Sequence, residues 1–169
     1  MKLKVGGKPI DGEASERHFE KQIVLDSLRW NMTAEHEAAV DEKGTKKVKT
    51  TNTPERLTIT KSFDRSSTNL CTYVAKRTPF NEAVISMVKS SASWDKDGAI
   101  PRKLIEMTIT DGLVESVSMS ASEEGLAVGV SETVTLSYHT MKIVYHPDPS
   151  EGARREAPAT TFEISLPEE

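Results

Sequence analysis

The sequence predicts a mainly β fold, a curled antiparallel β-barrel or sandwich with one short flanking α-helix at about residues 66–77. Three observations support this fold class. Apolar and polar residues alternate with period two along most of the chain, which is typical of strands buried on one face. In two segments the alternation shifts by one residue, as happens where a bulge bends a strand in a curled sheet. One segment alone has the apolar spacing of a helix.

Length and composition fit a single domain spanning residues 1–169, long enough to bury a core without cross-links. The formal net charge of −4 gives no general attraction for nucleic acid or an anionic membrane. Cys71 is the only cysteine, which excludes an intrachain disulfide and a cysteine metal cage. No apolar run has the length of a signal peptide or of a membrane span. We therefore expect synthesis in the cytoplasm and no membrane insertion.

The first phase shift lies in the N-terminal part of the chain. Ile23 and Leu25 share one face of an extended segment, whereas Leu28 and Trp30 follow with the opposite phase. This pattern predicts a bulge around residues 26–27 within one bending strand.

Residues 33–55 form a charged loop that we expect to fold as a hairpin. The first half is acidic, the second half is rich in lysine, and Gly44 lies between them. The two halves would then face each other as strands of opposite charge. The alternation at residues 57–61 predicts the strand that follows.

The predicted helix has recognisable signals at both ends. Asp64 or Ser66 can cap its N-terminus, and Pro79 disfavours helical geometry at the preceding residue. Its narrow apolar stripe has the spacing i, i+3 and i+4 and consists of Leu70, Tyr73 and Val74.

Strands are also predicted in the middle of the chain. Residues 82–88 form a nearly continuous apolar strand. Residues 104–110 and 113–120 alternate and are joined by Asp111-Gly112, a dipeptide typical of tight hairpin turns. The sequence therefore predicts an antiparallel hairpin at this dipeptide.

The second phase shift lies within residues 133–145, where the apolar set changes phase near His139-Thr140. This predicts a bulge inside one long strand. Three prolines at residues 147–160 indicate a loop, and alternation at residues 161–166 predicts a last strand. We therefore expect residues 147–169 to form a loop plus a terminal strand.

The sequence offers no catalytic, cofactor-binding or metal site, so we predict that the chain is not an enzyme. The glycines at 125 and 129 lack the Lys-Ser/Thr of a phosphate-binding loop. Residues 95–98 predict a plain turn, because apolar residues follow where a calcium loop needs oxygen ligands. Cys71 is expected to be a half-buried thiol. Four histidines lack the spacing of metal ligands: His18, His36, His139 and His146.

The charged hairpin at 33–55 allows three interpretations. Its arms can simply be solvated, each neutralising the other. Its lysines can also bind single-stranded nucleic acid, although no aromatic residue accompanies them. Alternatively, the opposite charges suit head-to-tail contact between identical copies.

Four blocks of the sequence occur in order between about residues 8 and 148. The first contains Ile10-Asp11-Gly12-Glu13, His18, Ile23 and Trp30. The second contains Leu57-Thr58-Ile59-Thr60-Lys61, Asp64, Ser66-Ser67 and Leu70. The third is LIEMTITDGLVESVSMS at 104–120, and the fourth is SETVTLSY at 131–138 with MKIVY at 141–145 and Pro147. Together the blocks resemble the Hcp family (haemolysin-coregulated protein), whose members form the inner tube of type VI secretion systems.

This resemblance implies a curled β-barrel with one flanking helix, six copies per ring and rings stacked into a hollow tube. The implied partners are further copies of the chain, a contractile sheath, a tip or spike protein and effector proteins, with no cofactor and no nucleic acid. The resemblance also implies secretion through the type VI apparatus without a signal peptide.

Within this interpretation, Lys46, Lys47 and Lys49 are the candidate contacts between rings. Two alternatives stay open. The chain can be a tail-tube or baseplate protein of a phage-like particle, which uses a related fold without secretion. The second alternative is an enzyme of unknown type.

Overall fold

The computed structural model describes residues 1–40, 46–95, 98–124, 127–147 and 159–166. It contains one helix, α1 (Ser67–Lys76), and eleven strands in these residues. The strands before α1 are β1 (Lys2–Val5), β2 (Lys8–Ile10), β3 (Ser27–Arg29), β4 (Met32–Val40), β5 (Lys46–Pro54) and β6 (Leu57–Ser62). Those after it are β7 (Pro79–Asp95), β8 (Gly98–Glu124), β9 (Ala127–Leu136), β10 (Thr140–Tyr145) and β11 (Thr160–Ser165). The predicted mainly β fold with one short helix is confirmed.

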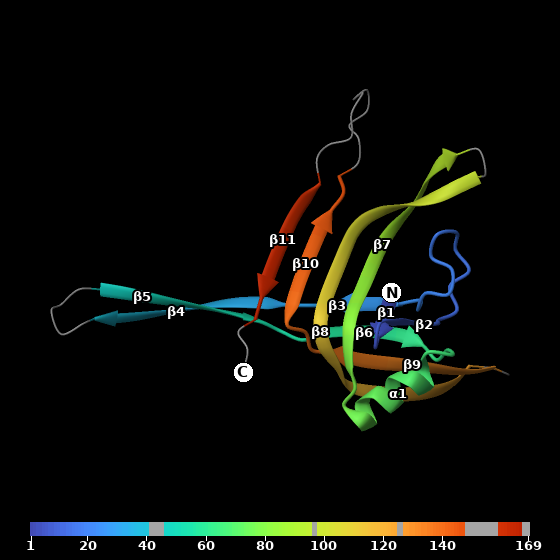
Figure 1. Cartoon of the computed structure of the whole chain (residues 1–169), viewed down its shortest axis with the longest axis horizontal. Coiled ribbons are helices and arrows are strands. Elements are labelled where there is room, and N and C mark those ends of the chain that lie inside the picture. Colours follow the sequence, from blue (N-terminus) through green and yellow to red (C-terminus); the bar gives the residue numbers. More distant parts are fainter. Residues whose placement is uncertain (41–45, 96–97, 125–126, 148–158, 167–169) are drawn as a thin grey trace.

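Nine strands form one antiparallel sheet, with a path that runs β2-β1-β7-β8-β9-β6-β3. β10 leaves this path by pairing with β8, and β11 pairs with β10. Figure 1 shows that the sheet bends where β8 passes from β7 to β9, with α1 below the bend. The described strands curl but do not close into a barrel, so the barrel form of the prediction is not what they adopt. The sheet therefore keeps free edges.

The hairpin predicted at Asp111-Gly112 does not form. A two-residue hairpin turn of type I′ needs positive φ at both positions, whereas here only Asp111 has one, at 51°. The chain therefore bends without reversing, and β8 continues through the dipeptide with a new partner on each side of it. Before the dipeptide it pairs with β7, and after it with β9.

At the two predicted bulges, one strand or segment ends and a separate strand begins. The shift near His139-Thr140 separates β9 from β10, and these strands pair with different parts of β8. The shift near residue 26 lies between an irregular segment and β3, where the Asp26 amide bonds to the Thr60 carbonyl at 2.8 Å. The end of a strand and a bulge within a strand both return the apolar residues to the buried face, so the alternation alone does not distinguish the two.

The remaining elements match the sequence. The strands predicted at 57–61 and 82–88 lie within β6 and β7, and the strand predicted at 161–166 matches β11 to within one residue at each end. In α1, Leu70 is buried and Tyr73 and Val74 pack against the core. The predicted turn at 95–98 and loop at 147–160 fall mostly outside the described residues. Core side chains come from both halves of the sheet and from the helix, including Leu3, Ile59, Leu70, Ile109, Leu136 and Met141.

The charged hairpin predicted at 33–55 is confirmed as the pair β4–β5. These strands pair with each other and form a separate two-stranded sheet. Figure 1 shows the pair projecting far beyond the nine-stranded sheet. We call the pair β4–β5 the arm, residues 30–32 and 54–56 its roots, and the nine-stranded sheet with α1 the body.

Candidate functional site

Among the described residues, no cluster of three or more His, Cys, Asp or Glu side chains has the geometry to hold a metal ion. His139 lies between β9 and β10, and His146 follows β10. His18 borders a shallow hollow of about 330 Å³ that also contains Glu82, but Glu82 is paired with Lys4 at 2.7 Å. Cys71 is a free, half-buried thiol, as predicted.

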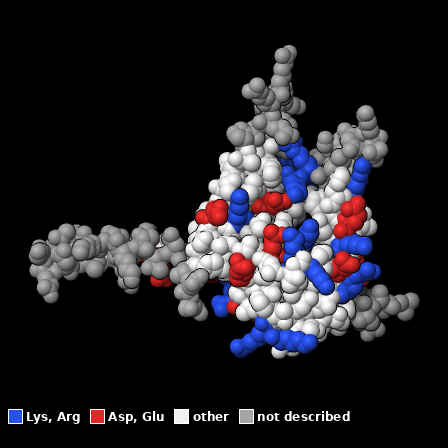
Figure 2. Space-filling model, viewed as in Figure 1, with Lys and Arg blue, Asp and Glu red and all other residues white. Residues whose placement is uncertain are grey.

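The surface of the body has charges of both signs and a shallow groove. Figure 2 shows the two signs intermixed on the face in view. The groove, of about 450 Å³, runs between the segment before β3 and the strand β7. Val24 and Val88 lie in it with 53% and 45% of their surface exposed. α1 is the one helix in the described part of the chain, and with ten residues it lacks the length needed to cross a bilayer.

The arm places the predicted lysines on β5. The register pairs Lys49 with Glu37, Lys47 with Ala39 and Lys46 with Val40. Lys49 therefore lies opposite an acidic position, as the opposite charges of the two halves predict. The structure describes the backbone of these lysine positions, so their role in contact between copies stays a prediction.

The roots of the arm meet at one partly buried hydroxyl group. The Trp30 Nε1–H donates to the Tyr138 hydroxyl oxygen at 2.7 Å. The Tyr138 hydroxyl in turn donates to the Glu55 backbone carbonyl at 2.9 Å. Tyr138 as a whole is 6% exposed, and both hydrogen bonds of its hydroxyl are partly buried. Burial raises the pKa of this hydroxyl above its ordinary value of 10.0, although the Trp30 hydrogen bond opposes the rise. The hydroxyl is therefore protonated at physiological pH and available as a donor.

Further contacts surround this hydroxyl. The Glu55 amide donates to the Asn31 carbonyl at 2.9 Å, and the Asn31 Nδ2 donates to Glu55 Oε1 at 3.1 Å. Arg56 pairs with Glu115 of β8. The Trp30 ring lies 6.2 Å from the Phe162 ring of β11, measured between centroids. Both roots are thus tied to each other and to the body.

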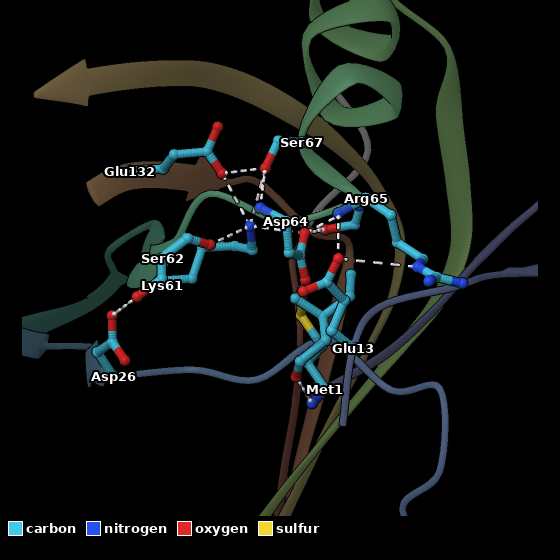
Figure 3. A network of polar contacts seen from close by, with 11 residues as sticks. Met1, Glu13, Asp26, Lys61, Ser62, Asp64, Arg65, Ser67 and Glu132 are labelled. Carbon is cyan, nitrogen blue, oxygen red and sulfur yellow. Dashed lines mark hydrogen bonds and ion pairs between the residues drawn. The ribbon is translucent and has the colours of Figure 1, made fainter. Parts of the chain in front are cut away.

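A second polar network lies beneath the N-terminus of α1, and its central residues Lys61, Ser67 and Glu132 are buried (Figure 3). The Lys61 ammonium donates to Glu132 Oε2 at 2.8 Å, to Ser67 Oγ at 3.0 Å and to the Ser62 carbonyl at 2.7 Å. Asp64 Oδ1 lies 2.9 Å from the same ammonium. Lys61 and Glu132 have fully buried side chains, so neither charge is solvated. The network joins β6, β9 and α1.

The serines and Asp64 complete this network. Ser67 donates to Glu132 Oε2 at 2.6 Å and accepts from the Asp64 amide at 2.9 Å. Asp64 Oδ1 accepts from the Ser66 amide at 2.8 Å, so Asp64 holds the turn before α1 while Ser66 occupies the cap position. Glu132 Oε1 is buried and has no hydrogen-bond partner among the residues that the structure describes. A hydroxyl–carboxylate pair this deeply buried serves the fold, because no substrate reaches it.

Burial and hydrogen bonding act in opposite directions on Asp64. Desolvation raises the pKa of its carboxyl, whereas hydrogen bonds from Ser66 and Lys61 and the charge of Lys61 lower it. The lowering dominates, and the pKa of Asp64 lies below its ordinary value of 3.8. Asp64 is therefore ionised in the folded protein at neutral pH.

Comparison with known proteins addresses the family and the fold. The family model described as "Type VI secretion system effector, Hcp" matches residues 2–145. No curated protein sequence matches the chain.

Several solved structures share the fold across nearly the whole chain. Hcp1 from Salmonella typhimurium is 29% identical, with a TM-score of 0.65, and the match covers 97% of this chain and 92% of that one. Hcp1 from E. coli EAEC 042, a double mutant, is 18% identical, with a TM-score of 0.71 and coverage of 97% and 95%. A type VI secretion system effector from Yersinia pestis is 16% identical, with a TM-score of 0.69 and coverage of 98% of both chains.

Proposed function

Because the chain belongs to the Hcp family of type VI secretion system proteins, we propose that it forms hexameric rings that stack into the inner tube of that apparatus. The observation that best supports ring formation is the open sheet. β2 and β3 end the strand path, and β11 ends the branch through β10. Unpaired strand edges pair readily with other chains, and a closed ring satisfies them without open-ended aggregation.

The arm supports the proposal that rings stack. It is a long β pair with its own charge pattern, and it projects from the body that would form the ring (Figure 1). We assign Lys46, Lys47 and Lys49 of the arm to the contact between successive rings. The arm extends the reach of each subunit well beyond its own sheet.

Export and cargo follow from the same proposal. The tube is assembled from cytoplasmic subunits inside a contractile sheath, leaves the cell through the apparatus behind a tip protein, and brings effector proteins with it. A phage-like tail tube would use the same surfaces, but the family match favours the secretion apparatus.

The first experiment is the assembly state of the purified chain. Light scattering coupled to size exclusion at micromolar concentration should give the mass of six chains of 18.6 kDa, about 112 kDa. Negative-stain images of the same peak should show rings. A species of 18.6 kDa that persists at high concentration would contradict the proposal.

A further inference from the structure

We propose that Tyr138 is a positioning residue for the arm, and that its hydroxyl group fixes the arm's direction relative to the ring body. This inference rests on the proposed function, because it assigns the geometry on which ring stacking depends. It adds a residue of the body to the assembly machinery, remote from the lysines that would make the contact.

In the described residues the arm makes no sheet hydrogen bonds of its own to the body, and it is attached through β3 and β6, which pair with each other. β4 and β5 pair with each other and with no other described strand. An isolated two-stranded hairpin is marginally stable in water and takes its direction from whatever holds its base. The roots therefore decide where the arm points.

The Tyr138 hydroxyl bonds to both roots at once. Trp30, before β4, donates to it, and the Glu55 carbonyl, after β5, accepts from it. These two residues flank the first pair of the hairpin, Met32 with Pro54. A single group that joins both strands resists rotation of the arm better than a contact with either strand alone.

The length of the arm makes this orientation consequential. Each strand has nine residues, and a rise of about 3.3 Å per residue gives an arm of about 30 Å. A rotation of about 10° at the roots would move its tip by about 5 Å. That displacement equals the spacing of about 4.8 Å between neighbouring strands, enough to miss a partner by one strand.

The test uses Tyr138→Phe, which removes the hydroxyl and keeps the ring in the core. Tyr145→Phe is the matched control, because Tyr145 lies at the far end of β10 and is 42% exposed. Tyr138→Phe should form rings as wild type does, whereas tubes should shorten by half or more in negative-stain images. Tyr145→Phe should give wild-type rings and tubes.

A second variant tests whether the two hydrogen bonds of Tyr138 act together. Trp30→Phe removes the donor at the other end of the relay, so it should shorten tubes as Tyr138→Phe does. Because both variants break one relay, the double variant should shorten tubes no further than either single one. Additive effects would contradict a shared positioning role.

Hydrogen exchange tests the inference even if the chain does not form rings. The Glu55 amide, bonded to the Asn31 carbonyl across the roots, should exchange about five- to tenfold faster in Tyr138→Phe, as expected for loss of one partly buried hydrogen bond. If the Glu55 amide exchanges faster in Tyr138→Phe but the wild-type protein forms no rings, the positioning role is supported and the proposed function is rejected. Unchanged exchange, or tubes of wild-type length in Tyr138→Phe, would overturn the inference.

Discussion

At the residue scale, the fold contains a lysine without access to water. Lys61 and Glu132 are fully buried and lie opposite each other in the β6–β9 register. A buried charge is costly unless it is paired and hydrogen-bonded, and removal of one partner leaves the other uncompensated. The network is thus sensitive to the loss of any single member.

Replacement of Lys61 by Met should lower the free energy of unfolding by about 3–5 kcal/mol, because Glu132 and Asp64 would keep buried charges without their cation. Urea denaturation followed by fluorescence measures this change. Lys142→Met is the matched control, since Lys142 is exposed on β10, and it should change stability by less than about 0.5 kcal/mol. An effect that small for Lys61→Met would contradict a stabilising role of the network.

The pKa of Asp64 predicts a loss of stability in acid. A carboxyl whose pKa is lowered by folding stabilises the protein above its unfolded value of 3.8, and this contribution is lost as pH falls through the folded value. Asp64→Asn removes the titration, so wild type should exceed the variant in stability at pH 6, and the difference should shrink below about pH 3.8. Denaturation curves between pH 6 and 2.5 measure it. A constant difference would assign the effect of Asp64 to its shape instead of its charge.

The sequence carries a sign of this network, because two charged residues occupy positions that the period-two alternation assigns to the buried face. Lys61 continues the buried series of Leu57 and Ile59, and Glu132 begins the buried series of Val134 and Leu136. Two opposite charges in the apolar phase of two strands indicate a buried ion pair if those strands are neighbours. That β6 and β9 are neighbours follows from topology, which the local pattern does not determine.

At the scale of elements, β8 shows how a strong local signal is overruled. Its 27 residues contain the dipeptide Asp111-Gly112, yet the chain continues because β7 and β9 supply partners on either side. Gly112 has a separate reason to be glycine. A Cβ atom there would lie 2.0 Å from the Ser137 carbonyl oxygen and 2.5 Å from the Phe80 ring.

Gly112→Ala should therefore destabilise the protein by about 1–3 kcal/mol, as overpacking typically does, because backbone as well as the Phe80 ring would have to shift. Gly129→Ala is the matched control, since the nearest atom to its added Cβ is 3.8 Å away. Thermal unfolding of both variants measures the difference. Equal melting temperatures for the two would show that the sheet relaxes freely at Gly112.

The element types were largely predictable, and their connections were not. The helix, the arm and the last strand follow from the apolar spacing or the charge pattern within their own short segments. The phase shifts near residues 26 and 139 mark real changes of environment. Whether such a change is a bulge within one strand or a boundary between two strands depends on which distant strand each half pairs with. Local alternation carries no information about that pairing.

At the scale of the whole molecule, the position of the lysines predicts a separation between ring formation and stacking. Reversal of Lys46, Lys47 and Lys49 to Glu changes the net charge from −4 to −10 and removes the attraction proposed between successive rings. Rings should persist, while tubes should shorten by half or more, and the effect should weaken at high salt. Negative-stain images at two salt concentrations measure tube length.

The same total charge placed elsewhere provides the control. Lys21, Lys76 and Lys142 are exposed, and their reversal to Glu also gives a net charge of −10. This variant should form tubes of wild-type length. Shortening by both variants would indicate general repulsion between subunits, and shortening by neither would remove the arm lysines from the contact.

The continuity of β8 also has a mechanical consequence. Both halves of the bent sheet contain part of the same continuous strand, β8. A pull on either half would therefore be transmitted to the other through an extended strand and not through a loop. If the proposed tube forms, a pull on one part of a subunit would reach the rest without first extending a loop.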